Sequence, residues 1–148
     1  MLFSALSATP VLAGLNLPAL QLLAEEGTVK EFPVSDLIVR EGEEGHSFFI
    51  LVAGSVEVIK NHDTPHAVIL ATLHARTFFG EMCVVDPVPR AATVRALTEV
   101  TAIQLKAATL YHLFRQMPDQ YSIVLLNLAR DMARRLRRLD EAFAARTS

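Results

Sequence analysis

The segment from Thr28 to Lys106 is the part of this chain that most restricts its fold. It consists of short runs of apolar and β-branched residues, separated by turn residues such as Pro33, Gly54 and the stretch 61–65. Many short strands at this spacing are typical of a sandwich or a jelly roll and differ from the pattern of parallel strands joined by helices. The strand-like runs cover residues 29–32, 37–40, 48–52, 56–60, 68–73, 93–97 and 101–105.

Helical segments flank these strands on both sides. Before them, Thr9-Pro10 can cap and open a short helix, and Asn16 with Pro18 can start a second helix that Gly27 ends. After them, residues 107–116 form one candidate helix, and Pro118 opens another that runs to about residue 144. The last helix carries an apolar stripe that suits a domain core, a lid over a ligand or the seam of a homodimer: Leu125, Leu128, Met132, Leu136, Leu139 and Phe143.

Length and composition limit the class of protein. A chain of 148 residues suits one domain with its own core, and a formal charge of −2 offers no broad electrostatic surface for nucleic acid. The single Cys83 excludes a disulfide framework within the chain and favours a reducing cytoplasm. No apolar run approaches the ~18–20 residues of a membrane span. The apolar N-terminus lacks the basic residues of a secretory signal, since the first basic residue is Lys30.

The segment from Phe78 to Val94 places Glu81 and Arg90 among apolar and small residues. Gly80 allows backbone N–H groups to approach a ligand closely, and a helical turn opening at Glu81 would aim its free N–H groups at an anion. Arg90 adds a planar, permanently charged fork that suits phosphate. A carboxylate repels phosphate, so Glu81 fits a ligand that also carries a hydroxyl donor, as a sugar does.

This segment resembles the phosphate-binding cassette of cyclic-nucleotide-binding domains, the family of the bacterial catabolite activator protein and the cAMP-dependent kinase regulatory subunits. The shared residues are Phe79-Gly80-Glu81-Met82 and Pro89-Arg90-Ala91-Ala92-Thr93-Val94, at the spacing usual in the family. The resemblance implies a single domain over residues 1–148. Its parts would be N-terminal helices over 1–27, an eight-stranded antiparallel jelly-roll β-barrel over 28–106 with a cassette helix within 79–93, and C-terminal lid or dimer helices over 107–148.

The resemblance also implies a role for each cassette residue. Arg90 would pair with the cyclic phosphate, and the backbone N–H groups of Cys83 and Ala91 would complete the phosphate site. Glu81 would accept a hydrogen bond from the ribose 2′-hydroxyl. Met82 and Thr93 are further residues assigned to the phosphate, and Gly80 joins Glu81 at the ribose.

Residues facing the base are also implied by the resemblance. Val58, Leu70 and Leu73 match apolar wall positions of the pocket, although the interior of a strand needs such residues in any case. A threonine commonly follows the phosphate-binding arginine in cGMP-selective relatives, and this chain has Ala91 there. We therefore expect cAMP to be favoured, with cGMP possible.

The last helix contains Met132-Ala133-Arg134-Arg135-Leu136, which is similar to the long helix of the catabolite activator protein. By this resemblance, Arg135 lies over the pocket near Glu81 and the base. Leu139 and Asp140 stand where that protein has two hydroxyl residues touching adenine, and neither can make the same contacts. The other arginines of this helix suit a polyanion site or, as we favour, a solvated helix face: Arg130, Arg134, Arg137 and Arg138.

The leading hypothesis is therefore a non-catalytic, cytoplasmic sensor in which a bound cyclic nucleotide changes how the terminal helix packs. No recognition helix follows before Ser148, so we expect no sequence-specific DNA binding. The output would then pass through an unidentified partner or domain, and the C-terminal helix offers a seam for a homodimer. A metal-dependent cupin is a weaker alternative, because only His62 and His66 lie close together and the family's His-x-His pattern is absent; we expect no metal. A third alternative keeps the fold and changes the ligand, because sensors of haem or small acids share this fold. In a haem sensor, His74 or Cys83 would be the candidate ligand of the iron.

Overall fold

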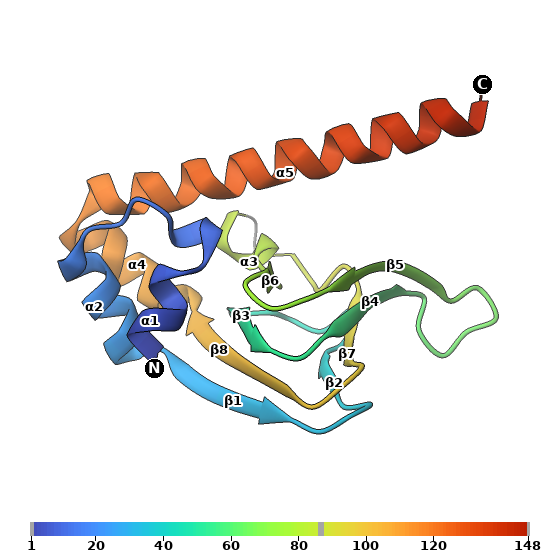
Figure 1. Cartoon of the computed structure of the whole chain (residues 1–148), viewed down its shortest axis with the longest axis horizontal. Helices are drawn as coiled ribbons and strands as arrows, with labels where there is room; N and C mark the ends of the chain where they lie inside the picture. The colour runs from blue at the N-terminus through green and yellow to red at the C-terminus, as the bar shows by residue number, and fades with distance from the viewer. Residues whose placement is uncertain (1, 86–87, 148) are drawn as a thin grey trace.

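Eight antiparallel strands form two four-stranded sheets in the computed structural model, which describes residues 2–85 and 88–147. The strand orders are β1-β8-β3-β6 and β2-β7-β4-β5, and Figure 1 shows the two sheets curving toward each other beneath a long helix. The strands are β1 (Thr28–Phe32), β2 (Leu37–Val39), β3 (Ser47–Ala53), β4 (Val56–Lys60), β5 (Val68–Leu73), β6 (Phe78–Phe79), β7 (Thr93–Ala96) and β8 (Val100–Lys106).

The predicted mainly β architecture is confirmed, but the prediction that the eight strands close into one barrel is wrong. Within the described residues, strand pairing stays inside each sheet and no ladder joins the two. Each of the seven predicted runs coincides with a strand to within two residues at either end. The eighth strand, β6, was not located from the sequence, because two consecutive phenylalanines are too short a run to show a period of two.

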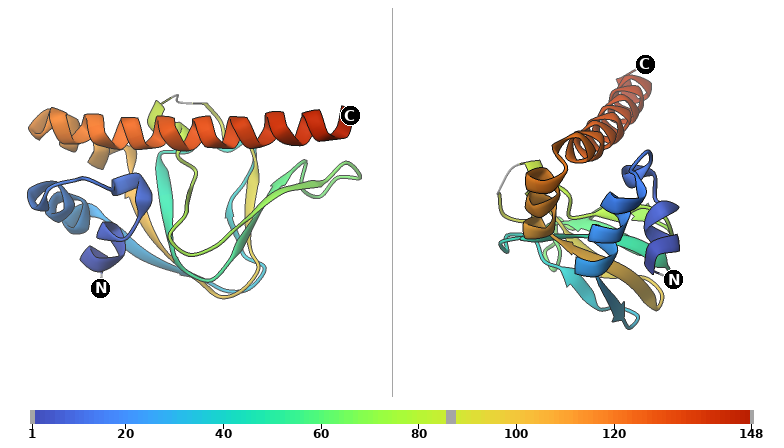
Figure 2. Two further views of the ribbon diagram at one scale, coloured as in Figure 1. Left: turned by 45° about the horizontal axis from the view of Figure 1, so that its top comes forward. Right: turned by 90° about the vertical axis from the view of Figure 1, so that its left-hand side faces the viewer.

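Helices gather at one end of the sheets, and α5 runs from there across the top of the molecule (Figures 1 and 2). The helices are α1 (Leu2–Ser7), the 3₁₀ turn η1 (Pro10–Leu12), α2 (Leu17–Glu26), α3 (Met82–Val85), α4 (Ala107–Gln116) and α5 (Pro118–Thr147). Asn16 caps α2 as expected, since its side chain accepts a hydrogen bond from the Ala19 N–H at 3.0 Å.

The first helix differs from the sequence expectation. The chain is already helical over α1, and Thr9 does not cap the segment that begins at Pro10. Its hydroxyl instead donates to the Ala5 carbonyl at 2.8 Å and so closes the preceding helix. A Thr9 side chain that is bonded to the preceding helix does not cap the turn that follows, and Thr9-Pro10 leads only into a single 3₁₀ turn.

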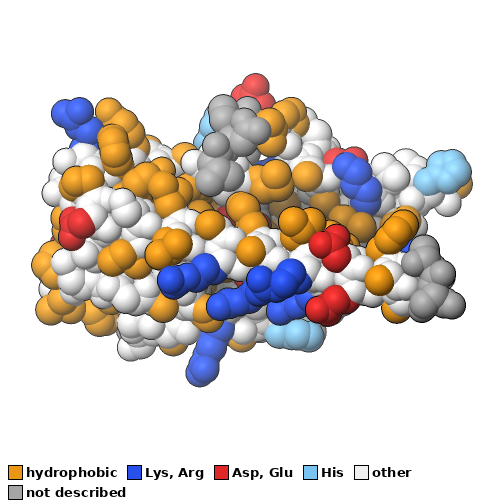
Figure 3. Space-filling model, turned by 90° about the horizontal axis from the view of Figure 1, so that it is seen from above, with side chains coloured by type: hydrophobic (Ala, Val, Ile, Leu, Met, Phe, Trp, Pro, Cys, Tyr) orange, Lys and Arg blue, Asp and Glu red, His pale blue; other side chains and the backbone are white. Residues whose placement is uncertain are grey.

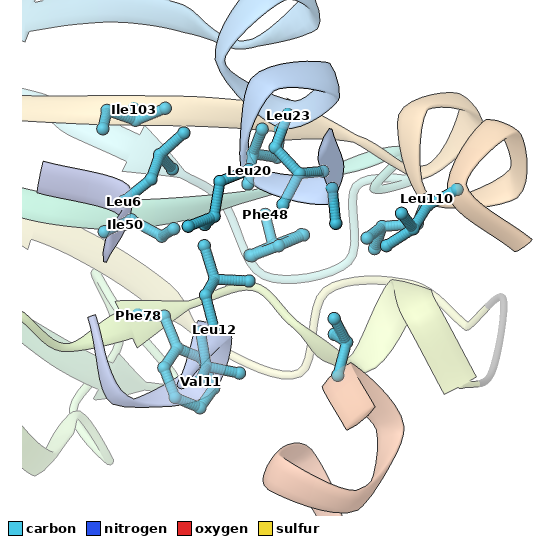
Figure 4. Close-up of a cluster of buried hydrophobic side chains, with 14 of the residues drawn as sticks. Leu6, Val11, Leu12, Leu20, Leu23, Phe48, Ile50, Phe78, Ile103 and Leu110 are labelled. Atoms are coloured by element: carbon cyan, nitrogen blue, oxygen red, sulfur yellow. The ribbon is translucent and has the colours of Figure 1, made fainter. Parts of the chain in front are cut away.

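Two apolar clusters hold the elements together. One lies between the N-terminal helices, β3, β8, α4 and the first half of α5, and Figure 4 shows Leu6, Leu12, Leu23 and Phe48 converging there. The other lies between the two sheets around Leu51 and Val56. The apolar stripe of α5 is thereby divided: its early part joins the first cluster through Leu128, whereas its late part is exposed, with Leu136, Leu139 and Phe143 at 60–68%.

The turn glycines provide a test of the fold. Positive φ values occur at Gly42 and Gly54 and not at Gly45. Gly54 (φ +92°) and Gly14 (φ +89°) have nearly the same φ, but an added Cβ would overlap the Glu99 carbonyl oxygen at Gly54 and meet only Ile123 at 3.6 Å at Gly14.

We expect Gly14→Ala to lower the free energy of unfolding by about 1–2 kcal/mol, the cost of a left-handed conformation in a residue with a side chain. Gly54→Ala should cost at least about twice that, because a backbone carbonyl must also move. Urea titrations of the two variants and the wild type measure both effects. Equal losses would contradict this account of the β3–β4 turn.

Candidate functional site

A cavity of about 340 Å³ opens between the β2-β7-β4-β5 sheet, the α3 segment and α5. Its size falls within the roughly 300–1,000 Å³ usual for small-molecule sites. Most of its lining is apolar, and the charged side chains that reach it are those of Glu81, Arg90, Arg135 and Arg138. An apolar pocket with a few convergent charges is the usual form of a ligand-binding site.

Arg90 enters the cavity from the loop that precedes β7. Its Nη1 donates to the Gly80 carbonyl at 2.9 Å, and its Nη2 donates to the Ser47 carbonyl at 2.7 Å. Its backbone N–H donates to the Glu43 carbonyl at 2.8 Å, so both its main chain and its side chain are held in place. A guanidinium has five N–H donors, and these two contacts leave the others available to an anion in the cavity.

Glu81 is 6% exposed and lies at the start of α3. Its Oε1 accepts a hydrogen bond from Arg135 Nη1 at 2.9 Å, which gives the buried carboxylate the charged partner that it needs. Arg135 is itself fixed twice more: its Nε lies 2.7 Å from Asp131 Oδ2, and its guanidinium carbon lies 5.3 Å from the centre of the Phe78 ring. These contacts join α5 to the floor of the cavity.

The backbone between Gly80 and α3 turns sharply beside these charges. Gly80 has a φ of +76°, and the Val84 N–H donates to the Glu81 carbonyl at 3.0 Å to start the helical turn. The N–H groups of Met82 and Cys83 therefore belong to the first turn of α3, where intrahelical acceptors are lacking. Because both residues line the cavity, this short turn faces the same space as Arg90.

The apolar wall comes from the sheet. Val58 of β4 pairs with Ala71 of β5 on one side and with Val94 of β7 on the other, and all three line the cavity. Leu73 and Leu70 extend the wall along β5. Leu70 is nevertheless 57% exposed, so the cavity is open to solvent where β5 forms the edge of its sheet.

The structure brings together ten of the thirteen residues that the sequence assigned to the site. They are Gly80, Glu81, Met82, Cys83, Arg90, Ala91, Val58, Leu70, Leu73 and Arg135. Thr93 does not line this cavity, because its side chain turns toward β2 and accepts a hydrogen bond from the Glu41 N–H at 3.1 Å. Leu139 and Asp140 are exposed on the part of α5 beyond the cavity.

Sequence reasoning missed several residues of the site. Arg138 lines the cavity, and its position three residues after Arg135, on the same helix face, would have indicated it. The other three arginines of this cluster are exposed, in line with the solvated helix face that we favoured, and Figure 3 shows basic side chains gathered along the middle of α5. Ser47 holds Arg90 through a backbone carbonyl, a contact that no side-chain pattern reveals.

Within residues 2–85 and 88–147, no group of three or more His, Cys, Asp or Glu side chains is arranged to hold a metal ion. In the same part of the chain, no helix combines the length and the apolar character that crossing a bilayer requires.

Cys83 is half-buried at the cavity wall, and burial raises the pKa of its thiol. Glu81 acts in the same direction, while the nearby Arg90 opposes it. A raised pKa leaves less of the reactive thiolate at neutral pH.

We expect iodoacetamide at about pH 8 to alkylate Cys83 more slowly in the folded protein than in urea-unfolded protein, with the pH midpoint of the rate shifted upward on folding. Equal rates and midpoints in the two states would contradict the placement of this thiol.

The cyclic nucleotide-binding domain model matches residues 29–117 of the chain. The CRP-like cAMP-activated global transcriptional regulator of Mycobacterium tuberculosis is 26% identical over 134 residues, which cover 90% of this chain and 58% of the regulator. The cAMP-dependent protein kinase regulatory subunit of Neurospora crassa is 33% identical over 103 residues, or 69% of this chain and 26% of the subunit. The chain thus spans about half of the first relative and a quarter of the second.

Solved structures have the same fold. A cyclic nucleotide-binding domain from Methylobacillus flagellatus superposes with a TM-score of 0.85 over 99% of this chain and 84% of its own, at 22% identity. The catabolite activator protein of Thermus thermophilus gives a TM-score of 0.77 at 26% identity, over 92% of this chain and 62% of its own. The match to the family model covers more than half of the chain, and the chain belongs to the cyclic nucleotide-binding domain family.

Proposed function

We propose that this chain is a sensor that binds a cyclic nucleotide, preferentially cAMP, in the cavity between Arg90 and Glu81. The observation that carries the proposal is that a buried carboxylate and an anchored guanidinium, nine residues apart in the chain, line one cavity together with an open helical turn. A cyclic nucleotide has an anionic phosphate and a ribose hydroxyl donor on one rigid ring system. It therefore matches both charges at once.

The phosphate would lie against Arg90 and the first turn of α3. A bidentate guanidinium–phosphate pair is among the strongest charge-assisted contacts, and the N–H groups of Met82, Cys83 and Ala91 would supply further donors. The ribose 2′-hydroxyl would donate to Glu81, whose second carboxylate oxygen can accept while the first is held by Arg135. The base would then lie along Val58, Leu70 and Leu73, under Arg135 and Arg138 of α5.

The preference for cAMP rests on the position after Arg90. A hydroxyl there can meet the amino group of guanine, and Ala91 has none. Two relatives named above are described as cAMP-activated or cAMP-dependent, which supports the same preference. Titrating one sample with cAMP and with cGMP by calorimetry tests it, and tighter binding of cGMP would contradict it.

Arg90→Ala tests the phosphate site directly. Losing the guanidinium leaves the phosphate charge desolvated and unpaired, which should cost roughly 3–5 kcal/mol, or two to nearly four orders of magnitude in cAMP affinity. Arg90→Lys should not restore binding, because an ammonium lacks the planar fork. Arg115→Ala is the matched control, since Arg115 is exposed on α4 and away from the cavity. Affinity within a few-fold of the wild type in Arg90→Ala would show that the site is assigned wrongly.

We further propose that the nucleotide changes the packing of α5. The helix is packed against α4 and η1 in its first half, whereas residues 133–146 are exposed, apart from the half-buried Arg135. Arg135 connects this second half to Glu81. A ligand that touches Glu81, Arg135 and Arg138 at once therefore binds more tightly when α5 is closed over the cavity, and it shifts the population toward that state.

Hydrogen exchange measures this change. Amides over residues 131–144 should exchange more slowly after cAMP is added, because the closed helix frays less. Arg135→Gln should reduce this protection, since it removes the ion pair to Glu81. Arg134→Gln is the control on the adjacent, exposed position of the same helix. Unchanged exchange on adding cAMP would argue against a response of α5.

The exposed apolar residues of α5 also fit a homodimer seam. Leu136, Leu139 and Phe143 follow at spacings of three and four, as on the contact face of paired helices, and all are more than half exposed. Light scattering during the cAMP titration reports the oligomeric state with and without ligand. A monomer under both conditions, at concentrations up to about 100 μM, would exclude a dimer of useful affinity.

A jelly roll is our interpretation of the sheet topology. The chain passes between the two sheets at each step except β4 to β5, and it pairs the first strand with the last. This path supports a jelly roll with two separate sheets. An experimental structure with a different strand order would contradict it.

A further inference from the structure

The guanidinium of Arg90 lies in a slot lined by Gly45 and Gly80. A Cβ added at Gly45 would overlap Nε and Cζ of Arg90 and lie 2.9 Å from its Cδ. A Cβ added at Gly80 would lie 2.6 Å from Nη1. Non-bonded carbon and nitrogen atoms do not approach this closely without one of them moving, so neither glycine has room for a side chain while the guanidinium keeps its place.

The two glycines are needed for different reasons. Gly80 has a φ of +76°, a conformation in which any side chain is strained, and its backbone alone accounts for a glycine. Gly45 lies outside the left-handed region, so its backbone would accept an alanine. Among the close contacts of its added Cβ, all three nearest atoms belong to the Arg90 side chain. The absence of a side chain at position 45 therefore makes room for the Arg90 side chain and is not required by the backbone of the turn.

We infer that Gly45 is a positioning residue for nucleotide binding, acting through Arg90. The inference rests on the proposed function and adds to it a determinant that does not line the cavity. In the turn between β2 and β3, the Glu43 carbonyl accepts a hydrogen bond from the Arg90 backbone N–H. Gly45, in the same turn, leaves the space that the guanidinium needs to reach the carbonyls of Ser47 and Gly80. The two carbonyls fix the guanidinium plane before a ligand arrives.

A methyl group at position 45 should displace the guanidinium and leave the fold intact. The overlapping atoms belong to a flexible side chain, which can rotate away without moving the backbone, whereas a backbone carbonyl cannot. The displaced guanidinium would give up its place against the two carbonyls and its alignment with the phosphate. Loss of one charge-assisted hydrogen bond corresponds to a decrease in affinity of roughly tenfold or more.

The test compares Gly45→Ala, Arg90→Ala, their double mutant and Gly14→Ala, with cAMP affinity by calorimetry and stability by urea titration. We expect Gly45→Ala to bind cAMP roughly tenfold or more weakly, with an unfolding midpoint close to that of the wild type. Gly14 precedes all of the cavity residues in the sequence and does not line the cavity. Gly14→Ala should therefore show the opposite result, a lower stability with an unchanged cAMP affinity. The double mutant should bind no more weakly than Arg90→Ala, because Gly45 acts only through that side chain.

Three results would overturn the inference. If Arg90→Ala binds weakly and Gly45→Ala binds within about twofold of the wild type, the slot has no role, although the proposed phosphate site stands. If the double mutant binds more weakly than Arg90→Ala, Gly45 acts through the general fold and not through the guanidinium. If neither Arg90→Ala nor Gly45→Ala changes the affinity, the proposed site and this inference both fail.

Discussion

The ion pair between Glu81 and Arg135 is the contact on which the organisation of this molecule depends. A carboxylate that is 6% exposed is costly unless a charged group and hydrogen bonds compensate for its lost hydration. That compensation comes from a residue 54 positions later, on the helix that runs over the sheets. The cavity and the helix are therefore not independent parts. Any ligand that changes the surroundings of Glu81 also changes the free energy of the contact that holds α5.

The two ends of the cavity differ in how they can signal. Arg90 is held by carbonyls of the β-sheet body, at Ser47 and Gly80, so a phosphate bound there contacts nothing that distinguishes one position of α5 from another. Glu81, Arg135 and Arg138 lie where the helix meets the body. A ligand shifts an equilibrium only through contacts that differ between the two states. The phosphate end would thus supply affinity, and the ribose and base end would supply the coupling.

How much of this was visible in the sequence depends on the range of each signal. Local signals were sufficient for α4, whose predicted and observed bounds agree, and for the Asn16 cap, because cap and helix lie within a few residues. Glu81 and Arg90, which the cassette motif assigned to one ligand, both line one cavity. The Arg90 contacts to Ser47 and Gly45 were not predictable, since a backbone carbonyl and a missing Cβ leave no pattern. The division of the α5 stripe also depended on tertiary packing, because Leu128 and Leu136 have the same periodicity and opposite exposure.

The exposed half of α5 limits how strong the coupling can be. Moving a two-state helix from mostly open to mostly closed requires roughly a 10⁴-fold difference in ligand affinity between the two states. Arg135 is already paired with Glu81 in the structure, so part of the contact energy of the closed state is present before any ligand binds. A ribose hydroxyl would add to that pair and not create it. If α5 responds as proposed, the response of one chain would therefore be graded and not all-or-none, unless the exposed Leu136, Leu139 and Phe143 are buried at the same time. Burying these three side chains would stabilise the closed state through the hydrophobic effect, a contribution to its free energy that the nucleotide alone does not provide.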